Sequence, residues 1–268
     1  MLLRSIEKTS ASRPAGFPFN VPVISNLEKV TFTAAVTFLV GENGSGKSTF
    51  LEALACAVGS ITVGSESVKS DPTLADIRRL VPYLKLVWTR RTRQGFFMRA
   101  EDFFGYARKL NTVRKDFQQE LAKLDEDEAY KGRDFAKGLA SLPYQNELHA
   151  LQQSYGDGLD AHSHGEGFLK LFQERFRGEG LYLLDEPESP LSPMRQLSFL
   201  AILHEMVAQK AQFVIATHSP IIMAYPQAKI LSFDEGRVAE VDYESLEHVQ
   251  VTRSFLENPD AYFRHLFS

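Results

Sequence analysis

The feature that most constrains the fold of this chain is the run Gly-Glu-Asn-Gly-Ser-Gly-Lys-Ser-Thr at residues 41–49. It follows an apolar, β-branched run at residues 34–40 and leads into a good helix former at residues 50–57. This order of strand, glycine loop and helix is the one that a phosphate-binding loop requires. Glycines let backbone N–H groups turn inward around a phosphate, and the helix start adds unpaired donors and the positive end of its dipole. We therefore predict that the chain binds a nucleoside triphosphate.

The residues of this loop have separate expected roles. Lys47 can reach the β- and γ-phosphates, and the hydroxyl of Ser48 can hold Mg²⁺. The other expected contacts to the nucleotide come from Gly41, Asn43, Gly44, Ser45, Gly46 and Thr49. The alternative is a glycine turn that happens to precede a lysine, which a chain of this length would contain by chance in about one case in a hundred.

Composition places the chain among ordinary globular proteins. Of its 268 residues, 44% are hydrophobic and 24% are charged, which is enough to bury a sizeable core. A formal net charge of −4 gives no general attraction to nucleic acid or anionic membranes and leaves room only for a local basic patch. The single cysteine, Cys56, rules out an intrachain disulfide, and we expect a packed thiol in the reducing cytoplasm.

The sequence gives no sign of a membrane segment. No apolar stretch is long enough to span a bilayer, and residues 1–20 lack the apolar core of a signal peptide. We expect a soluble cytoplasmic protein without direct membrane insertion, so any membrane association would need a partner.

The hydrophobic pattern predicts an α/β fold with a mostly parallel sheet flanked by helices. Runs expected to be strands lie at residues 21–30, 31–40, 84–89, 181–184 and 212–216, with a β-hairpin at 229–233 and 238–243. Residues 10–22 are expected to be a loop or an edge segment, and residues 59–72 a loop with room for a short strand. A helix capped by Ser192 is expected at residues 194–210, and a helical tail, broken near Pro259, at 245–266.

A basic segment at residues 90–99 carries Arg90, Arg91, Arg93 and Arg99 beside aromatic residues. These arginines could grip a nucleic-acid backbone, line a nucleotide site in salt bridges, or form a solvated turn. The net charge argues against a large basic face, and the sequence leaves these three readings open.

Residues 100–160 are predicted to be a mostly helical insertion within a single domain that spans residues 1–268. Charged helical segments at 104–110 and 113–124 precede an acidic run at residues 125–128. Such a run is typical of a solvated helix end and not of a metal site. The apolar spacing shows no sustained heptads, so no long coiled coil is expected.

Ser-His-Gly-Glu-Gly at residues 163–167 opens a helix predicted at residues 168–176. Ser163 fits an N-cap, and Glu166, three residues further on, completes a capping box. The same helix start, with Gly165, is also suited to hold a phosphate. The two interpretations are compatible, because a capped helix start also binds anions.

Two adjacent carboxylates, Asp185 and Glu186, end the apolar strand predicted at residues 181–184. The carboxyl ends of strands are where α/β sheets bind ligands. Asp185 can hold Mg²⁺, often through water, and Glu186 can orient or deprotonate the attacking water. The alternative is an acidic turn after a strand. His218 follows a later strand at the same topological position, although a lone histidine is more often structural.

The order of the glycine loop, Ser-His-Gly-Glu-Gly, the carboxylate pair and His218 resembles the ATP-binding-cassette (ABC) ATPase family. Residues 163–176, 181–193 and 212–226 are particularly similar to the small stand-alone AAA-family ATPases of bacteria, which are ABC-type and related to the SMC and RecF-like ATPases. The resemblance covers nearly the whole chain. It implies a P-loop ATP hydrolase that uses ATP and Mg²⁺.

The resemblance assigns Lys47 and Ser48 to the Walker A motif, which binds the phosphates. Asp185 matches Walker B, and Glu186 matches its catalytic glutamate. Gln94, within the arginine cluster, is the best match for the loop glutamine that touches Mg²⁺ and the attacking water.

The resemblance also matches residues 163–167 to the signature motif, with His164 where transporters typically have a glycine. His218 matches the switch histidine. Phe17 and Phe19 lie at about the right distance before the loop to stack on adenine, although core packing explains them equally well.

The resemblance also implies a head-to-tail homodimer that forms on ATP binding. Lys47, Ser48 and Thr49 of one subunit would hold the nucleotide that Ser163 and Gly165 of the other subunit cover, so hydrolysis would depend on closure. Three roles are open: an ATPase acting on nucleic acid or a partner protein, the ATP-binding subunit of a membrane transporter, or an ATP-gated module with negligible turnover. The arginines favour the first, and the carboxylate pair argues against the third.

Overall fold

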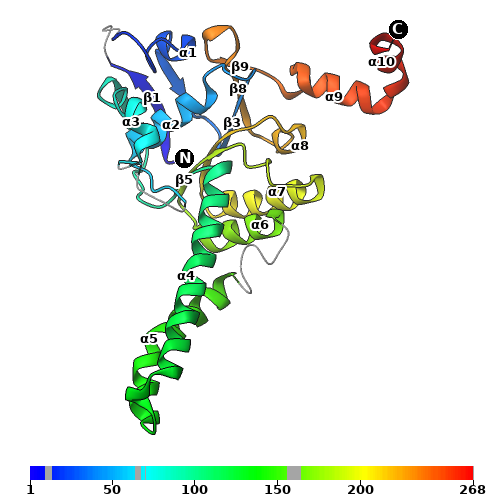
Figure 1. Ribbon diagram of the computed structural model, residues 1–268. Coiled ribbons are helices and arrows are strands. Elements are labelled where there is room, and N and C mark those ends of the chain that lie inside the picture. Colours follow the sequence, from blue (N-terminus) through cyan, green and yellow to red (C-terminus); the bar gives the residue numbers. More distant parts are fainter. Residues whose placement is uncertain (10–13, 64–67, 70, 156–163, 268) are drawn as a thin grey trace. The chain divides into compact units, whose positions relative to one another are not determined.

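The computed structural model describes residues 1–9, 14–63, 68–69, 71–155 and 164–267. The chain divides into two compact units, each described by itself below (Figure 1). The first unit contains most of the N-terminal hundred residues together with Phe176–Ser268, and the second consists mainly of Glu101–Arg175.

The first unit is built around a six-stranded sheet with the strand order β5-β6-β7-β3-β8-β9. Its strands are β3 (Val36–Val40), β5 (Phe97–Arg99), β6 (Leu181–Asp185), β7 (Gln212–Ala216), β8 (Lys229–Ser232) and β9 (Ala239–Glu240). All pairs are parallel except β8 with β9. Every residue of β3, β6 and β7 is buried, which explains why these strands are continuous apolar runs. The carboxyl ends of the parallel strands therefore meet at one edge of the sheet.

A second, antiparallel sheet has the order β2-β1-β4, with β1 at Leu3–Lys8, β2 at Lys29–Thr31 and β4 at Leu84–Trp88. The buried side chain of Gln212, the first residue of β7, connects the two sheets. Its Oε1 accepts hydrogen bonds from the backbone N–H groups of Leu2 (2.9 Å) and Leu3 (2.8 Å), and its Nε2 donates to the Leu3 carbonyl (2.9 Å). A buried amide is stable here because its polar atoms have partners.

The helices of the first unit are α1 (Pro22–Ser25), α2 (Lys47–Val58), α3 (Ala75–Arg78), α7 (Pro193–Ala208), α8 (Pro220–Met223), α9 (Glu247–Glu257) and α10 (Pro259–Leu266). Short 3₁₀ turns lie at η1 (Pro72–Leu74), η2 (Val81–Tyr83), η4 (Asp234–Gly236) and η5 (Tyr243–Ser245). The predicted break in the helical tail is confirmed, and it falls at Asn258, whose side chain accepts a hydrogen bond from Ala261 N. Ser192 occupies the N-cap position of α7, but its side chain makes no capping hydrogen bond.

The prediction of a strand over residues 21–30 is wrong. Pro22 occupies the first position of helix α1, where its fixed φ angle and missing N–H are tolerated, and only Lys29–Thr31 joins a sheet. The second predicted strand, residues 31–40, shortens to β3. The expected hairpin forms, but its second strand has only two residues, because Asp-Glu-Gly makes a 3₁₀ turn in which Glu235 has φ +57°.

The second unit contains α4 (Ala100–Glu126), the turn η3 (Glu128–Tyr130), α5 (Asp134–Tyr155) and α6 (His164–Arg175). Helices α4 and α5 run side by side in opposite directions (Figure 1). The rings of Phe117 and Tyr144 lie 6.1 Å apart, and Lys137 Nζ lies 2.8 Å from Asp125 Oδ1. Arg175 Nη2 on α6 donates a 2.8 Å hydrogen bond to the hydroxyl of Tyr106 on α4. These contacts make the second unit a helical hairpin with a third helix against it.

Among the described residues, no helix combines the length and the apolar character that crossing a bilayer requires.

Candidate nucleotide-binding site

The glycine loop lies between β3 and α2, as the sequence predicts. Gly41, Gly44 and Gly46 have φ angles of +139°, +83° and +98°, a backbone region that favours glycine. A Cβ atom on Gly46 would lie 2.6 Å from Val23 Cγ1 and 2.8 Å from Val21 Cγ1. Helix α1 therefore packs so closely beneath the loop that only glycine fits there.

The start of the loop is anchored by Asp234, which the sequence reasoning missed. Asp234 Oδ1 accepts a 2.9 Å hydrogen bond from the Glu42 N–H, and its Oδ2 accepts one of 2.8 Å from the Ser232 hydroxyl. Asp234 follows β8, the neighbour of β3, so its place at the carboxyl edge of the sheet could have indicated this role.

The ammonium group of Lys47 is buried inside the curve of the loop. Its Nζ donates to the carbonyl oxygens of Gly41 (2.7 Å) and Glu42 (3.0 Å), and the residue is 5% exposed. Burial lowers the pKa of Lys47, while the nearby charges of Asp185 and Glu186 oppose that shift. The structure thus brings the predicted phosphate-binding lysine together with both predicted carboxylates.

Ser48 and Asp185 meet at the carboxyl edge of the sheet. The Ser48 hydroxyl makes a hydrogen bond to the Asp185 carboxyl group, and Asp185 is 8% exposed. Within the described part of the chain, Asp185 Oδ1 is buried and has no hydrogen-bond partner. Burial raises the pKa of Asp185 to about 6, although the Ser48 hydrogen bond works against the shift. A hydroxyl beside a carboxylate with one unsatisfied oxygen is the hard oxygen set that Mg²⁺ prefers, so these two residues fit the ion.

Glu186 is held in an unusual backbone conformation. Its φ angle is +50°, which is uncommon for a residue with a side chain and is typical of functional sites. Its N–H donates to the Ala216 carbonyl at the end of β7 (2.9 Å), and its carbonyl accepts from Ser189 N (3.1 Å). These bonds fix the turn after β6, and the Glu186 charge acts on Lys47, whose pKa it raises.

His218 is positioned by Glu188, a second residue that the sequence reasoning missed. The His218 N–H donates a 2.6 Å hydrogen bond to Glu188 Oε1, and the Thr217 side chain also bonds to this carboxyl group. Burial raises the pKa of Glu188. No motif in the sequence marks Glu188 as different from any other acidic residue in a turn.

The His218 imidazole itself lies among the site residues. Burial lowers the pKa of His218, and the charge of Lys47 lowers it further, while Glu186 opposes both. The Nε2 atom is buried, and no hydrogen-bond partner for it is found among the residues that the structure describes. This nitrogen is therefore available to a ligand.

Gln94 is not brought to this site. Its carbonyl accepts a 3.0 Å hydrogen bond from Leu181 N at the start of β6, whereas Asp185 ends the same strand. The parallel strands hold these two residues at opposite edges of the sheet, so the metal-ligand assignment of Gln94 is withdrawn. In the register of β5 with β6, Arg99 is the residue that pairs with Asp185.

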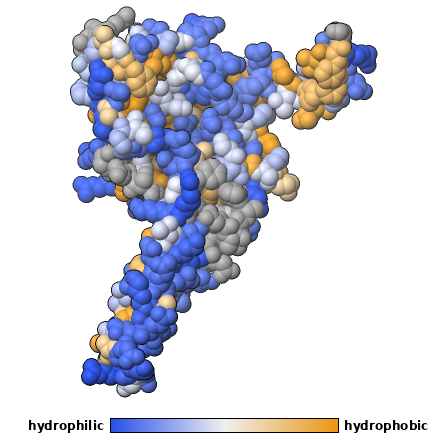
Figure 2. Space-filling view, in the orientation of Figure 1, coloured by the Kyte–Doolittle hydropathy of each residue, from blue (hydrophilic) through white to orange (hydrophobic). Residues whose placement is uncertain are grey.

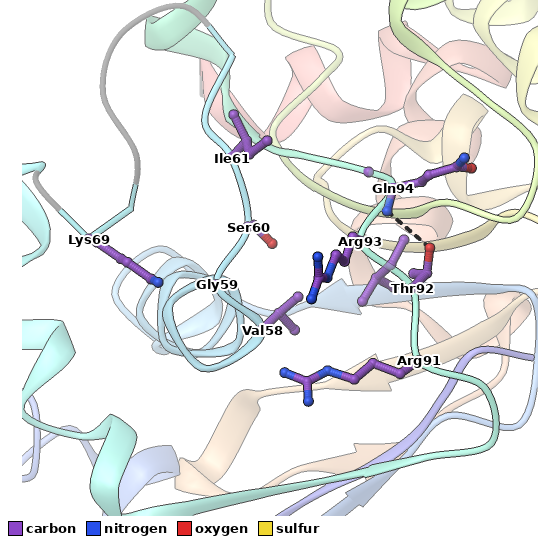
Figure 3. A pocket seen from close by; sticks show the side chains of 11 residues that line it. Val58, Gly59, Ser60, Ile61, Lys69, Arg91, Thr92, Arg93 and Gln94 are labelled. Atoms are coloured by element: carbon purple, nitrogen blue, oxygen red, sulfur yellow. Dashed lines mark hydrogen bonds between the residues drawn. The ribbon is translucent and has the colours of Figure 1, made fainter.

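Gln94 instead lines a separate cavity of about 570 Å³, together with Lys69, Arg91 and Arg93 (Figure 3). No carboxylate is present among the described residues that line it. The side chains of both arginines extend toward the end of α2 near Val58 (Figure 3).

The other two arginines of the basic segment serve as ion-pair partners. Arg90 Nη2 lies 2.5 Å from Glu179 Oε2. Arg99 contacts Asp71 (3.0 Å) and Glu52 (3.3 Å). Arg90 and Arg99 are thus salt-bridged, but the ion pair of Arg90 does not line the nucleotide site.

The signature residues belong to the second unit. Gly165 and Glu166 lie in the first turn of α6, while Ser163 lies outside the described residues. Of the two aromatic candidates for adenine stacking, Phe19 is buried against Tyr83 with ring centroids 5.4 Å apart, so it packs in the core. Phe17 is 46% exposed.

Comparisons with known proteins point to one family. A family model described as an AAA domain matches residues 19–154. The energy-coupling factor transporter ATP-binding protein EcfA2 of Streptococcus sanguinis is 31% identical over 252 residues, covering 88% of this chain and 80% of that protein. The protein of the same name from Methanospirillum hungatei is 26% identical over 243 residues, covering 83% of this chain and only 52% of that protein.

Matches among solved structures include a metal-chelate type ABC transporter and an Smc head domain from Pyrococcus furiosus. The first is 18% identical with a TM-score of 0.48, covering 92% of this chain and 86% of that chain. The second is 11% identical with a TM-score of 0.45, covering 96% and 99%. Because the family model spans just over half of the 268 residues and the S. sanguinis relative exceeds 30% identity, the chain belongs to the AAA-domain family of ATPases.

Proposed function

We propose that the protein hydrolyses ATP in an Mg²⁺-dependent reaction at the site formed by the glycine loop and the ends of β6 and β7. The observation that carries the proposal is the hydrogen bond of Ser48 to Asp185, which leaves one buried Asp185 oxygen without a partner in the described chain. Ser48 and Asp185 would hold Mg²⁺, which neutralises charge on the β- and γ-phosphates when it is bound.

The protein groups have separate roles in this reaction. The Lys47 ammonium binds the β- and γ-phosphates, and the backbone N–H groups of the loop bind the remaining phosphate oxygens. Glu186 orients the attacking water and accepts its proton. His218 hydrogen-bonds to the terminal phosphate and holds the water in line with it.

We further propose that the complete site forms between two copies of the chain. By resemblance, Ser163, Gly165 and Glu166 of one copy cover the nucleotide held by Lys47 of the other. The start of α6 supports this role, because the unpaired N–H groups and dipole of a helix start attract a phosphate.

A mixing experiment tests this arrangement. Lys47→Ala chains and Ser163→Arg chains should each be inactive alone, because each lacks one half of every site. Mixed in equal amounts, they should recover part of the wild-type ATPase rate through dimers that contain one intact site. If the mixture stays as inactive as the separate variants, the shared site is ruled out.

For the target of the ATPase cycle, we favour nucleic acid. Arg91 and Arg93 are spaced two residues apart in a loop that Gly95 holds against Leu181, and with Lys69 they line a cavity without a described carboxylate. Such a set of cations suits the phosphates of a nucleic-acid backbone. ATPase stimulation by DNA should be lost in the Arg91→Ala, Arg93→Ala double variant, while the basal rate should be unchanged. Equal stimulation of both proteins would argue against this target.

The second candidate function is the ATP-binding subunit of a membrane transporter. It is favoured by the curated relatives, which carry that description. It is also compatible with apolar side chains exposed on the C-terminal helices, where Leu256 is 71% and Leu266 68% exposed (Figure 2). Co-purification of the full chain with an integral membrane protein, lost on Leu266→Asp, would support this candidate over the first.

A further inference from the structure

A cavity of about 310 Å³ lies between the start of the glycine loop and helix α9. Gly41 and Glu42 line it from the loop, Asp234 from the turn after β8, and His218 from the end of β7. Helix α9 contributes Glu247 and His248, and the roles described so far leave His248 unused.

The cavity adjoins the start of the glycine loop, where the Lys47 ammonium is held. Lys47 Nζ donates to the carbonyl oxygens of Gly41 and Glu42, and both of these residues line the cavity. In phosphate-binding loops this lysine reaches the β- and γ-phosphates. A side chain that faces this cavity is therefore close to where the γ-phosphate of bound ATP would be.

Helix α9 holds His248 in a fixed place. The flanking residues Leu246 and Val249 are 8% and 2% exposed, so they anchor the first turn in the core. The preceding turn η5 is fastened to α8, because the Tyr243 hydroxyl donates a 3.0 Å hydrogen bond to the Pro220 carbonyl. His248 is thus presented to the cavity by a packed element.

Both histidines of the cavity have an unsatisfied nitrogen. The Nε2 atoms of His218 and His248 are buried, and neither has a hydrogen-bond partner in the part of the chain that the structure describes. Buried polar atoms are hydrogen-bonded in the large majority of cases, so two exceptions at one cavity indicate a ligand there. A phosphate oxygen accepts such a hydrogen bond, and the loop residues whose carbonyls hold the Lys47 ammonium also line this cavity.

We propose that His248 is a second histidine of the nucleotide site, and that its Nε2–H donates a hydrogen bond to the terminal phosphate of bound ATP beside His218. This inference rests on the proposed function, because it assigns a further phosphate-binding residue to the same site. It extends the site to the C-terminal part of the chain, which no motif connects with the nucleotide.

The electrostatic surroundings agree with a donor role. Burial lowers the pKa of His248, and the neighbouring His218 lowers it further, while Asp234 and Glu42 oppose the shift. At neutral pH the imidazole is therefore uncharged and has one N–H group, which can reside on Nε2. A neutral donor can lie beside the Lys47 ammonium without like-charge repulsion.

The test compares the affinities of ATP and ADP in the full chain, with Glu186→Gln as the parent so that ATP is not consumed. In His248→Ala, the Kd for Mg²⁺–ATP should rise about tenfold, the effect of one hydrogen bond to a charged group, while the Kd for ADP stays the same. His248→Gln should restore part of the ATP affinity, because its amide can donate from a similar position. His265→Ala, an exposed histidine on α10, is the matched control and should bind like the parent.

A structural role for His248 predicts a different pattern. In that case ATP and ADP affinities fall together or neither changes, and His248→Leu, which keeps the bulk of the side chain, binds both as the parent does. Either result overturns the inference about His248 and leaves the proposed ATPase function standing. If the parent chain binds no ATP, the proposed function fails, and the inference fails with it.

Discussion

The backbone N–H of His218 donates a 2.6 Å hydrogen bond to Glu188 Oε1, and this bond joins the two loops that carry the proposed catalytic groups. Glu188 lies two residues after Glu186 in the turn that follows β6, while His218 follows β7. Because β6 and β7 are adjacent and parallel, a single carboxylate can set the distance between the two loops. Glu188 is therefore a positioning residue for the reaction.

Replacing Glu188 tests this positioning. Glu188→Ala should lower kcat for ATP hydrolysis about tenfold to a hundredfold with little change in KM, because His218 is displaced while the glycine loop is untouched. Glu188→Gln keeps an acceptor oxygen for the His218 N–H and should retain most of the activity. A large rise in KM with unchanged kcat in Glu188→Ala would contradict the positioning role.

Asp185→Asn should weaken the response to Mg²⁺. The amide keeps one oxygen beside Ser48 but removes the negative charge that the ion needs, so the Mg²⁺ concentration for half-maximal ATPase rate should rise by about tenfold or more. Asp260→Asn on the exposed start of α10 is the control and should behave as wild type. An unchanged Mg²⁺ requirement in Asp185→Asn would remove Asp185 from the metal site.

Gly95→Ala should strongly destabilise the fold. Gly95 has φ +118°, and a Cβ atom there would lie 1.8 Å from the Leu181 carbonyl oxygen, so the loop would have to move away from β6. We expect the free energy of unfolding to fall by about 3 kcal/mol or more in chemical denaturation. At Gly59, which has φ +73° and no atom within 4 Å of the added Cβ, alanine should cost only about 1–2 kcal/mol. Equal losses for the two variants would contradict this reading of the Gly95 contact.

Cys56 should resist alkylation in the folded protein. Burial raises the pKa of this thiol from 9.0 to about 11, so at any pH below 9 the thiolate fraction is roughly a hundredfold smaller than in an unfolded chain. Iodoacetamide labelling followed by mass spectrometry should therefore be about a hundredfold slower in native conditions than in urea. Comparable rates in the two conditions would show that the thiol is not shielded.

The sequence predicted the parts of the site that depend on local patterns. The glycine loop between β3 and α2 and the meeting of Ser48 with Asp185 follow from motif order and from the rule that carboxyl ends of parallel strands share an edge. The continuous apolar runs also indicated β6 and β7, since strands buried on both faces show no alternation.

The positions of the remaining site residues depend on strand register and on long-range packing, which local sequence patterns do not encode. Gln94 matches the loop glutamine only by resemblance. Because β5 starts at Phe97, Arg99 pairs with Asp185 in its place. His248 acquires its position from helix α9 packing beside the loop, a long-range contact without a sequence signature.

The central claim is that Glu186 activates the water that attacks ATP. The most direct measurement is the single-turnover hydrolysis rate of the wild-type chain and of Glu186→Gln with Mg²⁺–ATP, together with the ATP affinity and oligomeric state of both. The account predicts that Glu186→Gln binds ATP as wild type does, hydrolyses it at least about a hundredfold more slowly, and accumulates as an ATP-bound dimer. Hydrolysis by Glu186→Gln at the wild-type rate would contradict it.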